Sequence, residues 1–282
     1  MTAKMNRSRR SGRFTISTAF SRISKLNTMR VKFRQLIPPE HGVWGFLGAA
    51  VGAGIGVAPT VAGSLIAAGL IVGVVARHAG QLALSGVRVW PAAVGLGVTC
   101  ACAWTWALWL APDAWPWLAG AAALTVLQLS SVAGSRRHGT AGVLVGGVAL
   151  ALVGGGIAAT GVPMMIAQRT NFDAEIVTSA VIGYLICVTP LVRARRQPNS
   201  PWKKHALAGH LVAAVSALSA AWLGVAPASL ACYFMFLLVR CLWLTRTRTG
   251  LRAATPKTIG LAELPPLILL VVATVVGIRS GW

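Results

Sequence analysis

Long apolar runs separated by short polar segments dominate the chain from residue 42 onward. A helix that crosses a bilayer needs about 20 mostly apolar residues, because the hydrocarbon core is roughly 30 Å thick. Runs of this kind, almost without charge, predict nine transmembrane helices in an all-α, polytopic bundle. Their expected bounds are 42–58, 60–76, 90–111, 115–133, 140–160, 174–192, 205–224, 227–244 and 261–279.

The first two predicted helices share one apolar run, from Val43 to Ala76. As a single helix rising 1.5 Å per residue, this run would be about 50 Å long, which exceeds the thickness of a bilayer. Ala58-Pro59-Thr60 is the expected break, because proline lacks a backbone donor and disfavours helix in the residue before it. We therefore expect two helices joined by a tight turn.

The basic residues predict how the bundle is oriented. Lys and Arg accumulate in the cytoplasmic loops of membrane proteins. With the nine helices at the bounds given above and the N-terminus inside, 24 of the 26 Lys and Arg residues fall on the cytoplasmic side. Only Arg169 and Arg279 fall outside. We expect a multi-pass protein of the inner or plasma membrane with a cytoplasmic N-terminus and an external C-terminus.

Composition and charge exclude two broad classes of protein. The 282 residues are 56% hydrophobic and 11% charged, whereas an ordinary soluble domain is roughly 25% charged. The net charge of +21 does not indicate nucleic acid binding, because the basic residues are spread over several loops with no recognition helix. The bilayer and its anionic headgroups are the expected partners, each nearby Lys or Arg contributing about 1 kcal/mol.

The chain divides into an N-terminal extension, residues 1–36, and a membrane domain, residues 37–282. The extension is basic, has no acidic residue and is rich in Ser and Thr, so it cannot bury a core and is expected to be disordered or to lie on the membrane. Its composition also loosely fits an organellar transit peptide. A start at Met29 is a further alternative, and the sequence does not choose among them.

Glycines at intervals of four residues predict sites of close helix packing. Gly48, Gly52 and Gly56 form such a series in the first predicted helix, and Gly142 and Gly146 form one in the fifth. Small residues at this spacing let backbones approach closely inside a membrane. The cluster at residues 154–156 is expected to loosen the outer end of the fifth helix instead.

The segment Pro38-Pro39-Glu40-His41-Gly42-Val43-Trp44-Gly45 concentrates ionisable and aromatic residues at the entrance of the first helix. It resembles the Pro-x-Glu-His-Gly-x-Trp-Gly element of the YwiC-like family of bacterial membrane proteins. The segment from Pro256 to Glu263 is similar to the same family's Lys-x-Ile-Gly-x-x-Glu element. The resemblance implies family-like positions but no mechanism: Glu40, His41, Gly42, Trp44, Lys257, Gly260 and Glu263.

The nine-helix arrangement is also similar, more loosely, to that of UbiA-type membrane prenyltransferases. Those enzymes bind magnesium and prenyl diphosphate with Asp-rich motifs in the loops after their second and sixth helices. Here the corresponding segments, 75–80 and 192–197, carry arginines and no carboxylate. Because Mg²⁺ is bound through carboxylate and phosphate oxygens, the similarity implies the architecture and disfavours that activity.

Arginine forms bidentate contacts with phosphate, so arginines on the cytoplasmic face predict a cavity for an anionic lipid or a phosphorylated isoprenoid-like ligand. The alternative is a carrier of a small, mostly uncharged substrate. The candidate ligand-binding residues are Glu40, His41, Trp44, Arg77, His78, Arg136, Arg137, Arg193, Arg195, Arg196, Lys257 and Glu263.

Catalysis and cofactors are left open by the sequence. If the protein is an enzyme, its acid or base is expected to be Glu40, Glu263 or one of the five histidines, all of which fall on or near the cytoplasmic face. The histidines have no informative spacing, so a metal site is not expected. The sequence indicates no cofactor and no oligomeric state.

Overall fold

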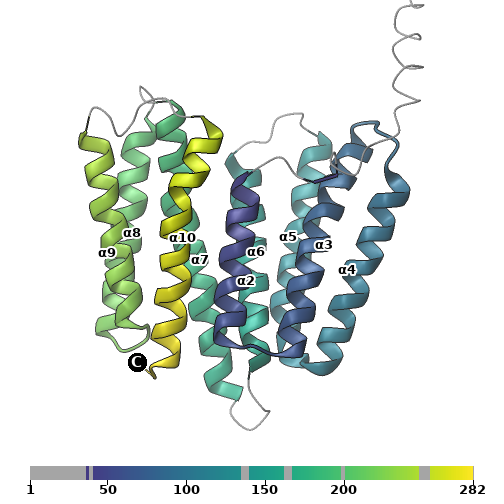
Figure 1. The fold of residues 1–282 in the computed structure, drawn as a ribbon, viewed down its shortest axis with the longest axis horizontal. Helices are drawn as coiled ribbons and strands as arrows, with labels where there is room; N and C mark the ends of the chain where they lie inside the picture. The colour runs from purple at the N-terminus through teal and green to yellow at the C-terminus, as the bar shows by residue number, and fades with distance from the viewer. Residues whose placement is uncertain are drawn as a thin grey trace, which may run out of the picture.

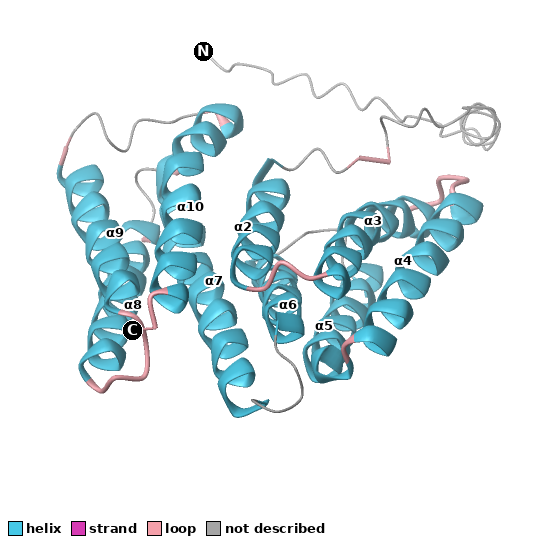
Figure 2. Cartoon of the chain, turned by 60° about the horizontal axis from the view of Figure 1, so that its bottom comes forward, coloured by secondary structure: helices cyan, strands magenta, loops and turns pink. Residues whose placement is uncertain are grey.

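The fold consists of helices that run side by side (Figures 1 and 2). A computed structural model describes residues 36–37, 41–134, 140–161, 167–197, 201–247 and 255–281, so the predicted N-terminal extension lies outside the described residues except for Leu36. The described part of the chain contains nine α-helices and no strand. They are α2 (His41–Val57), α3 (Val61–Leu84), α4 (Trp90–Leu110), α5 (Trp115–Gly134), α6 (Thr140–Ala158), α7 (Ala167–Arg196), α8 (Trp202–Trp222), α9 (Ala228–Arg246) and α10 (Pro256–Arg279), with short 3-10 helices at Pro112–Ala114 and Ala159–Gly161.

The nine predicted helices are confirmed, and so is the break between the first two. The chain leaves α2 at Val57 and enters α3 at Val61. Thr60 caps α3, because its side-chain oxygen accepts a 2.9 Å hydrogen bond from the backbone N–H of Gly63. The tight turn therefore has a specific hydrogen bond that begins the second helix.

Several helices extend beyond the predicted apolar runs. The prediction that 75–80 and 192–197 form loops is wrong, since 75–80 lies within α3 and 192–196 completes α7. The last helix begins at Pro256 and not at residue 261 as predicted, so Pro265 and Pro266 lie in its interior. A charged residue ends an apolar run in the sequence, but it does not end a helix whose backbone hydrogen bonds continue into the interface.

The bundle has two blocks on either side of a central group (Figure 1). The helices α2, α6 and α7 occupy the centre, α3, α4 and α5 lie on one side, and α8, α9 and α10 lie on the other. One end of the bundle joins the helices through the connections α3–α4, α5–α6, α7–α8 and α9–α10. We call this end the basic face, because Arg88, Arg196 and Arg246 lie on it.

Exposed apolar side chains indicate that the bundle is surrounded by lipid. Seven of the described helices are long and apolar enough to cross a membrane, and α2 is a shorter apolar helix. Exposed tryptophans lie at both ends, including Trp90 and Trp243 near the basic face and Trp109 and Trp222 near the opposite end. Tryptophan concentrates at membrane–water interfaces. The protein is a multi-pass membrane protein.

Glycines allow α2 to pack closely on α10, although not all those predicted take part. Gly52 lies against Val271, and a Cβ atom at Gly56 would collide with Val275. Gly48 was expected in the same series, but it is exposed and has nothing within 4 Å of where a Cβ atom would be. Two of the three predicted glycines, Gly52 and Gly56, thus allow α2 to pack closely on α10.

The glycine cluster at the end of α6 does not loosen the helix. The helix continues to Ala158 through all three glycines. Gly154 lies against Ala50 of α2, while Gly155 and Gly156 lie against Trp117 of α5. Consecutive residues point about 100° apart around a helix, so neighbouring glycines let different helices approach α6. The expectation of a loosened end is wrong because neighbouring helices cover this surface.

Candidate functional site

The candidate residues predicted from the sequence lie on several helices near the basic face. Trp44 is half-buried on α2, Arg77 and His78 are half-buried on α3, and Arg193 and Arg195 are half-buried near the end of α7, beside the exposed Arg196. Glu263 is buried on α10. The remaining candidates, or their side chains, lie outside the described residues: Glu40, His41, Arg136, Arg137 and Lys257.

The structure distributes these residues over two places and does not gather them in one. Arg77 lines a cavity whose walls are α3, α4, α5 and α6. Arg195 and Glu263 lie together in a polar cluster between α7, α9 and α10. Arg193 belongs to neither place, because its guanidinium lies over the ring of Trp202, 4.8 Å from the ring centroid. A ligand held jointly by Arg77 and Arg195 is therefore not favoured by this arrangement.

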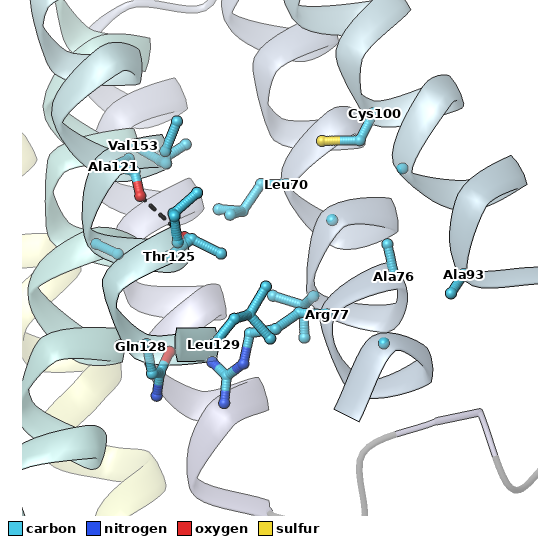
Figure 3. Close-up of a pocket in the computed structure, with 18 of the residues that line it drawn as sticks. Leu70, Ala76, Arg77, Ala93, Cys100, Ala121, Thr125, Gln128, Leu129 and Val153 are labelled. Carbon is cyan, nitrogen blue, oxygen red and sulfur yellow. Dashed lines mark hydrogen bonds between the residues drawn. The ribbon is translucent and has the colours of Figure 1, made fainter. Parts of the chain in front are cut away.

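The cavity has a volume of about 410 Å³ and is lined mostly by apolar side chains (Figure 3). This size lies in the usual range for small-molecule sites, roughly 300–1,000 Å³. Gly80 and Gly97 both line it, and a Cβ atom added at either would have nothing within 4 Å. Missing side chains on two facing helices therefore help to leave the space open.

Polar groups gather at the end of the cavity near the basic face. Arg77 lies seven residues before Leu84, the last residue of α3, which is about 10 Å along the helix. Its guanidinium extends towards the side chain of Gln128 (Figure 3). Gln128 is 5% exposed and donates a short hydrogen bond from its amide nitrogen to the carbonyl of Gly142. The cavity thus has a cationic end beneath the basic face.

Gly146 makes room for these polar groups. A Cβ atom at this position would lie 2.9 Å from the amide nitrogen of Gln128 and 3.3 Å from a guanidinium nitrogen of Arg77. Gly146 was predicted to allow close packing. The groups that pack against it are polar side chains, Gln128 of α5 and Arg77 of α3. A larger residue would displace the side chains that form the polar end.

The end of the cavity away from the basic face is closed by the contact of α3 with α4. The indole N–H of Trp104 donates a 3.2 Å hydrogen bond to the carbonyl of Ile66. Gly69 brings the backbone of α3 directly under the Trp104 ring, with the nearest ring atom 2.5 Å from where a Cβ atom would be. The indole covers the gap between the helices. The cavity is therefore polar at one end and closed by an aromatic side chain at the other.

The polar cluster in the other block is built around an ion pair between Glu263 and Arg240. Two guanidinium nitrogens of Arg240 donate to the two carboxylate oxygens of Glu263 at 2.8 and 2.9 Å. The side chains are only 16% and 7% exposed, respectively. Arg240 lies six residues before Arg246, the end of α9, so the pair lies roughly 9 Å below the end of the helix.

The prolines of α10 supply another acceptor to Arg240. Pro266 has no N–H, so it leaves the carbonyl of Ala262, four residues earlier, without its helical hydrogen bond. Arg240 donates to this carbonyl at 3.2 Å. The hydroxyl of Tyr233 donates to the carbonyl of Pro266 at 3.0 Å. The interior prolines therefore adapt α10 to side chains from α9.

Helices α7 and α8 add further polar groups around the pair. Arg195 lies 3.8 Å from a carboxylate oxygen of Glu263, and the Tyr184 hydroxyl lies 3.5 Å from the other. His210 is 1% exposed, and its Nδ1 donates to the carbonyl of Ala206 at 2.7 Å, since a carbonyl only accepts. Within the described residues, Nε2 of His210 has no hydrogen-bond partner. The carboxylate of Glu263 thus faces two guanidinium groups, those of Arg240 and Arg195.

Sequence reasoning missed Arg240, Gln128 and the burial of His210. Arg240 was counted with a cytoplasmic loop and His210 with the membrane surface, although both fall within predicted helices. An ionisable residue inside an apolar run is the pattern that could have identified both, because such residues usually face the interior of a membrane protein. Gln128 has no comparable pattern, since a single uncharged amide inside an apolar run does not by itself indicate a cavity.

The chemistry of the described residues includes no cluster suited to a metal. No group of three His, Cys, Asp or Glu side chains within the described ranges lies close enough to bind a metal ion. The five cysteines are free, and Cys100 lines the apolar cavity. What the arrangement offers a ligand is a long apolar surface with a cation at one end.

Comparison with known proteins identifies part of the chain. Residues 37–158 match the model of the family described as YwiC-like protein. The match contains every residue that lines the cavity, from Leu70 to Val153, and excludes the Arg240–Glu263 pair. No curated protein and no solved structure matches the chain.

Proposed function

We propose that this chain, which matches the YwiC-like family model over residues 37–158, binds an anionic amphiphile in the cavity between α3, α4, α5 and α6. The ligand is an anionic lipid or a phosphorylated isoprenoid-like molecule. Its charged head lies at Arg77 and Gln128, and its hydrocarbon chain follows the apolar wall. The proposal rests on the family's own segment, since the cavity lies wholly within it.

The observation that carries this proposal is the polarity of the cavity. A guanidinium group lies at one end of a space whose other walls are almost entirely apolar. Arginine binds phosphate through two parallel hydrogen bonds, and water or ions compete less well in a surrounding of low dielectric constant. A free inorganic anion would leave the apolar wall unfilled, and an apolar ligand would make no use of the guanidinium that lines the cavity. An amphiphile satisfies both ends.

The orientation of the protein in its membrane is part of the proposal. We place the basic face in the cytoplasm and the protein in the inner or plasma membrane. The basic residues favour this placement, since Arg88, Arg193, Arg196 and Arg246 lie at or near the basic face. Outside the cavity these arginines attract anionic headgroups of the surrounding bilayer.

Native mass spectrometry of the protein purified in mild detergent tests the proposal. We expect a co-purifying lipid whose mass identifies its headgroup, and we expect Arg77→Gln to lose it. Arg88→Gln is the matched control, because it removes an arginine that is exposed in the loop between α3 and α4 and does not line the cavity. Loss of a buried charged contact to phosphate costs about 1.5–3 kcal/mol, so affinity falls roughly 10- to 100-fold.

Two results contradict the proposal. The first is a parent protein that retains no anionic lipid and takes none up from vesicles of phosphatidylglycerol. The second is equal retention by the parent and the Arg77→Gln variant, which would show that the lipid lies elsewhere on the protein.

A further inference from the structure

The walls of the cavity are not equally closed. Helix α4 packs along α3, and α5 packs along α6, but the backbones of α4 and α5 have hardly any contact with each other among the described residues. Both nevertheless contribute side chains to the cavity. The cavity is therefore bounded on this side by side chains alone.

Side chains along the α4–α5 side lie both in the cavity and on the outer surface. Val94 on α4 and Val126 on α5 line the cavity, yet they are 58% and 66% exposed. Trp90, at the start of α4, also lines it and is 53% exposed. Side chains that line the cavity and are more than half exposed are consistent with an opening of the cavity to the outer surface between α4 and α5. We define these three residues as the rim.

The rim lies on the part of the bundle that faces hydrocarbon. Val94 is four residues after Trp90, which begins α4 at the basic face, so it lies about 6 Å along the helix. Trp90 is placed as interfacial tryptophans usually are. The opening therefore faces the leaflet next to the basic face, at the depth where a lipid's headgroup passes into its chains.

We infer that the ligand is a lipid resident in the bilayer, and that it enters the cavity sideways between α4 and α5 from the leaflet next to the basic face. This inference rests on the proposed function and specifies its ligand class. The entering chain passes Val94 and Val126, while the anionic head moves inward from the interface to Arg77. A soluble phosphate compound would have no reason to cross a rim of valines.

Substitutions at the rim test this route. The protein is reconstituted in nanodiscs of phosphatidylcholine containing phosphatidylglycerol with a photoactivatable group on one acyl chain. After illumination, the labelled peptides are identified by mass spectrometry, and α5 between Ala121 and Leu129 is expected to be labelled in the parent. We expect a Val94→Trp, Val126→Trp variant to be labelled about tenfold more slowly, which equals a barrier higher by about 1.4 kcal/mol.

Val98→Trp is the matched control. Val98 lies on the same helix and is 56% exposed, but it does not line the cavity. Its variant is expected to be labelled at the parent's rate. Because all three valines are more than half exposed, a tryptophan at any of them is expected to leave the helix packing intact, which an unchanged unfolding temperature would verify.

The outcomes separate this inference from the proposed function. If the parent is labelled in an Arg77-dependent way and the rim variant is labelled at the same rate, entry between α4 and α5 is wrong while the cavity ligand stands. If the parent shows no Arg77-dependent labelling in the cavity, the proposed function fails and the inference fails with it.

Discussion

Two arginines at similar depth have different surroundings in the two blocks of the bundle. Arg77 lies seven residues before the end of α3, and Arg240 lies six residues before the end of α9. Arg240 has a bidentate carboxylate partner, Glu263, and a proline-freed carbonyl. Arg77 lines a cavity that is open enough for a ligand. Position relative to the basic face alone therefore does not determine what an arginine does.

The residues opposite each arginine explain the difference. Around Arg77, Gly80, Gly97 and Gly146 supply no side chains to fill the space. The Arg240 cluster, by contrast, lies among large buried side chains, including Tyr184. The filled block holds Arg240 in an ion pair with Glu263, whereas the block with space places Arg77 at the wall of a cavity that can take a ligand. The following predictions test this comparison.

Breaking the ion pair is expected to have the largest effect. Glu263→Gln leaves the guanidinium of Arg240 without a carboxylate in a buried position, which costs about 3–5 kcal/mol. Thermal unfolding in detergent should show a large fall in the midpoint. Replacing both members, by Arg240→Met with Glu263→Leu, should restore part of the stability, because the buried charge of Arg240 is removed together with its partner, while Arg195 still loses its 3.8 Å contact with the carboxylate. If the double variant unfolds at no higher temperature than Glu263→Gln, the two side chains contribute more to stability than the neutralisation of each other's charge.

Filling the cavity is expected to affect binding without loss of stability. Gly97→Leu adds a side chain where a Cβ atom meets nothing within 4 Å, and it replaces glycine, which costs a helix up to about 1 kcal/mol relative to alanine. Lipid retention should fall at least about tenfold, a loss of roughly 1.4 kcal/mol. Gly95→Leu is the control, since Gly95 is equally open but does not line the cavity. Equal retention by both variants would place the ligand outside the cavity.

A smaller effect is expected from Gly146→Ala. The added methyl group lies 2.9 Å from the amide nitrogen of Gln128, so the side chains at the polar end must move. Overpacking of this kind costs about 1–3 kcal/mol, and part of it should appear as weaker lipid binding. Gly142→Ala is the matched control on the same helix, because its Cβ atom would meet nothing. If the two variants unfold at the same temperature, the close contact between Gly146 and Gln128 is contradicted.

The sequence was sufficient for the helices and only partly for the sites. Apolar runs predicted all nine helices of the described chain, since a membrane helix satisfies its own backbone and needs only length and apolar side chains. Glu263 was selected through its family-like element, and the structure places it in the polar cluster. Its partner was not found, because Arg240 belongs to another helix and 22 residues separate it from Ala262. Pairing between helices has no pattern within either one.

What the sequence determined by itself was a multi-pass, all-α membrane protein with a YwiC-like element at the start of its first helix. These properties follow from local patterns of apolar, basic and glycine residues. Only the tertiary structure decided which arginine binds Glu263 and which lines the cavity, because both depend on the side chains that other helices bring to the same depth. Gly80 and Gly97 appear unremarkable in the sequence, yet together they leave the space beside Arg77 open.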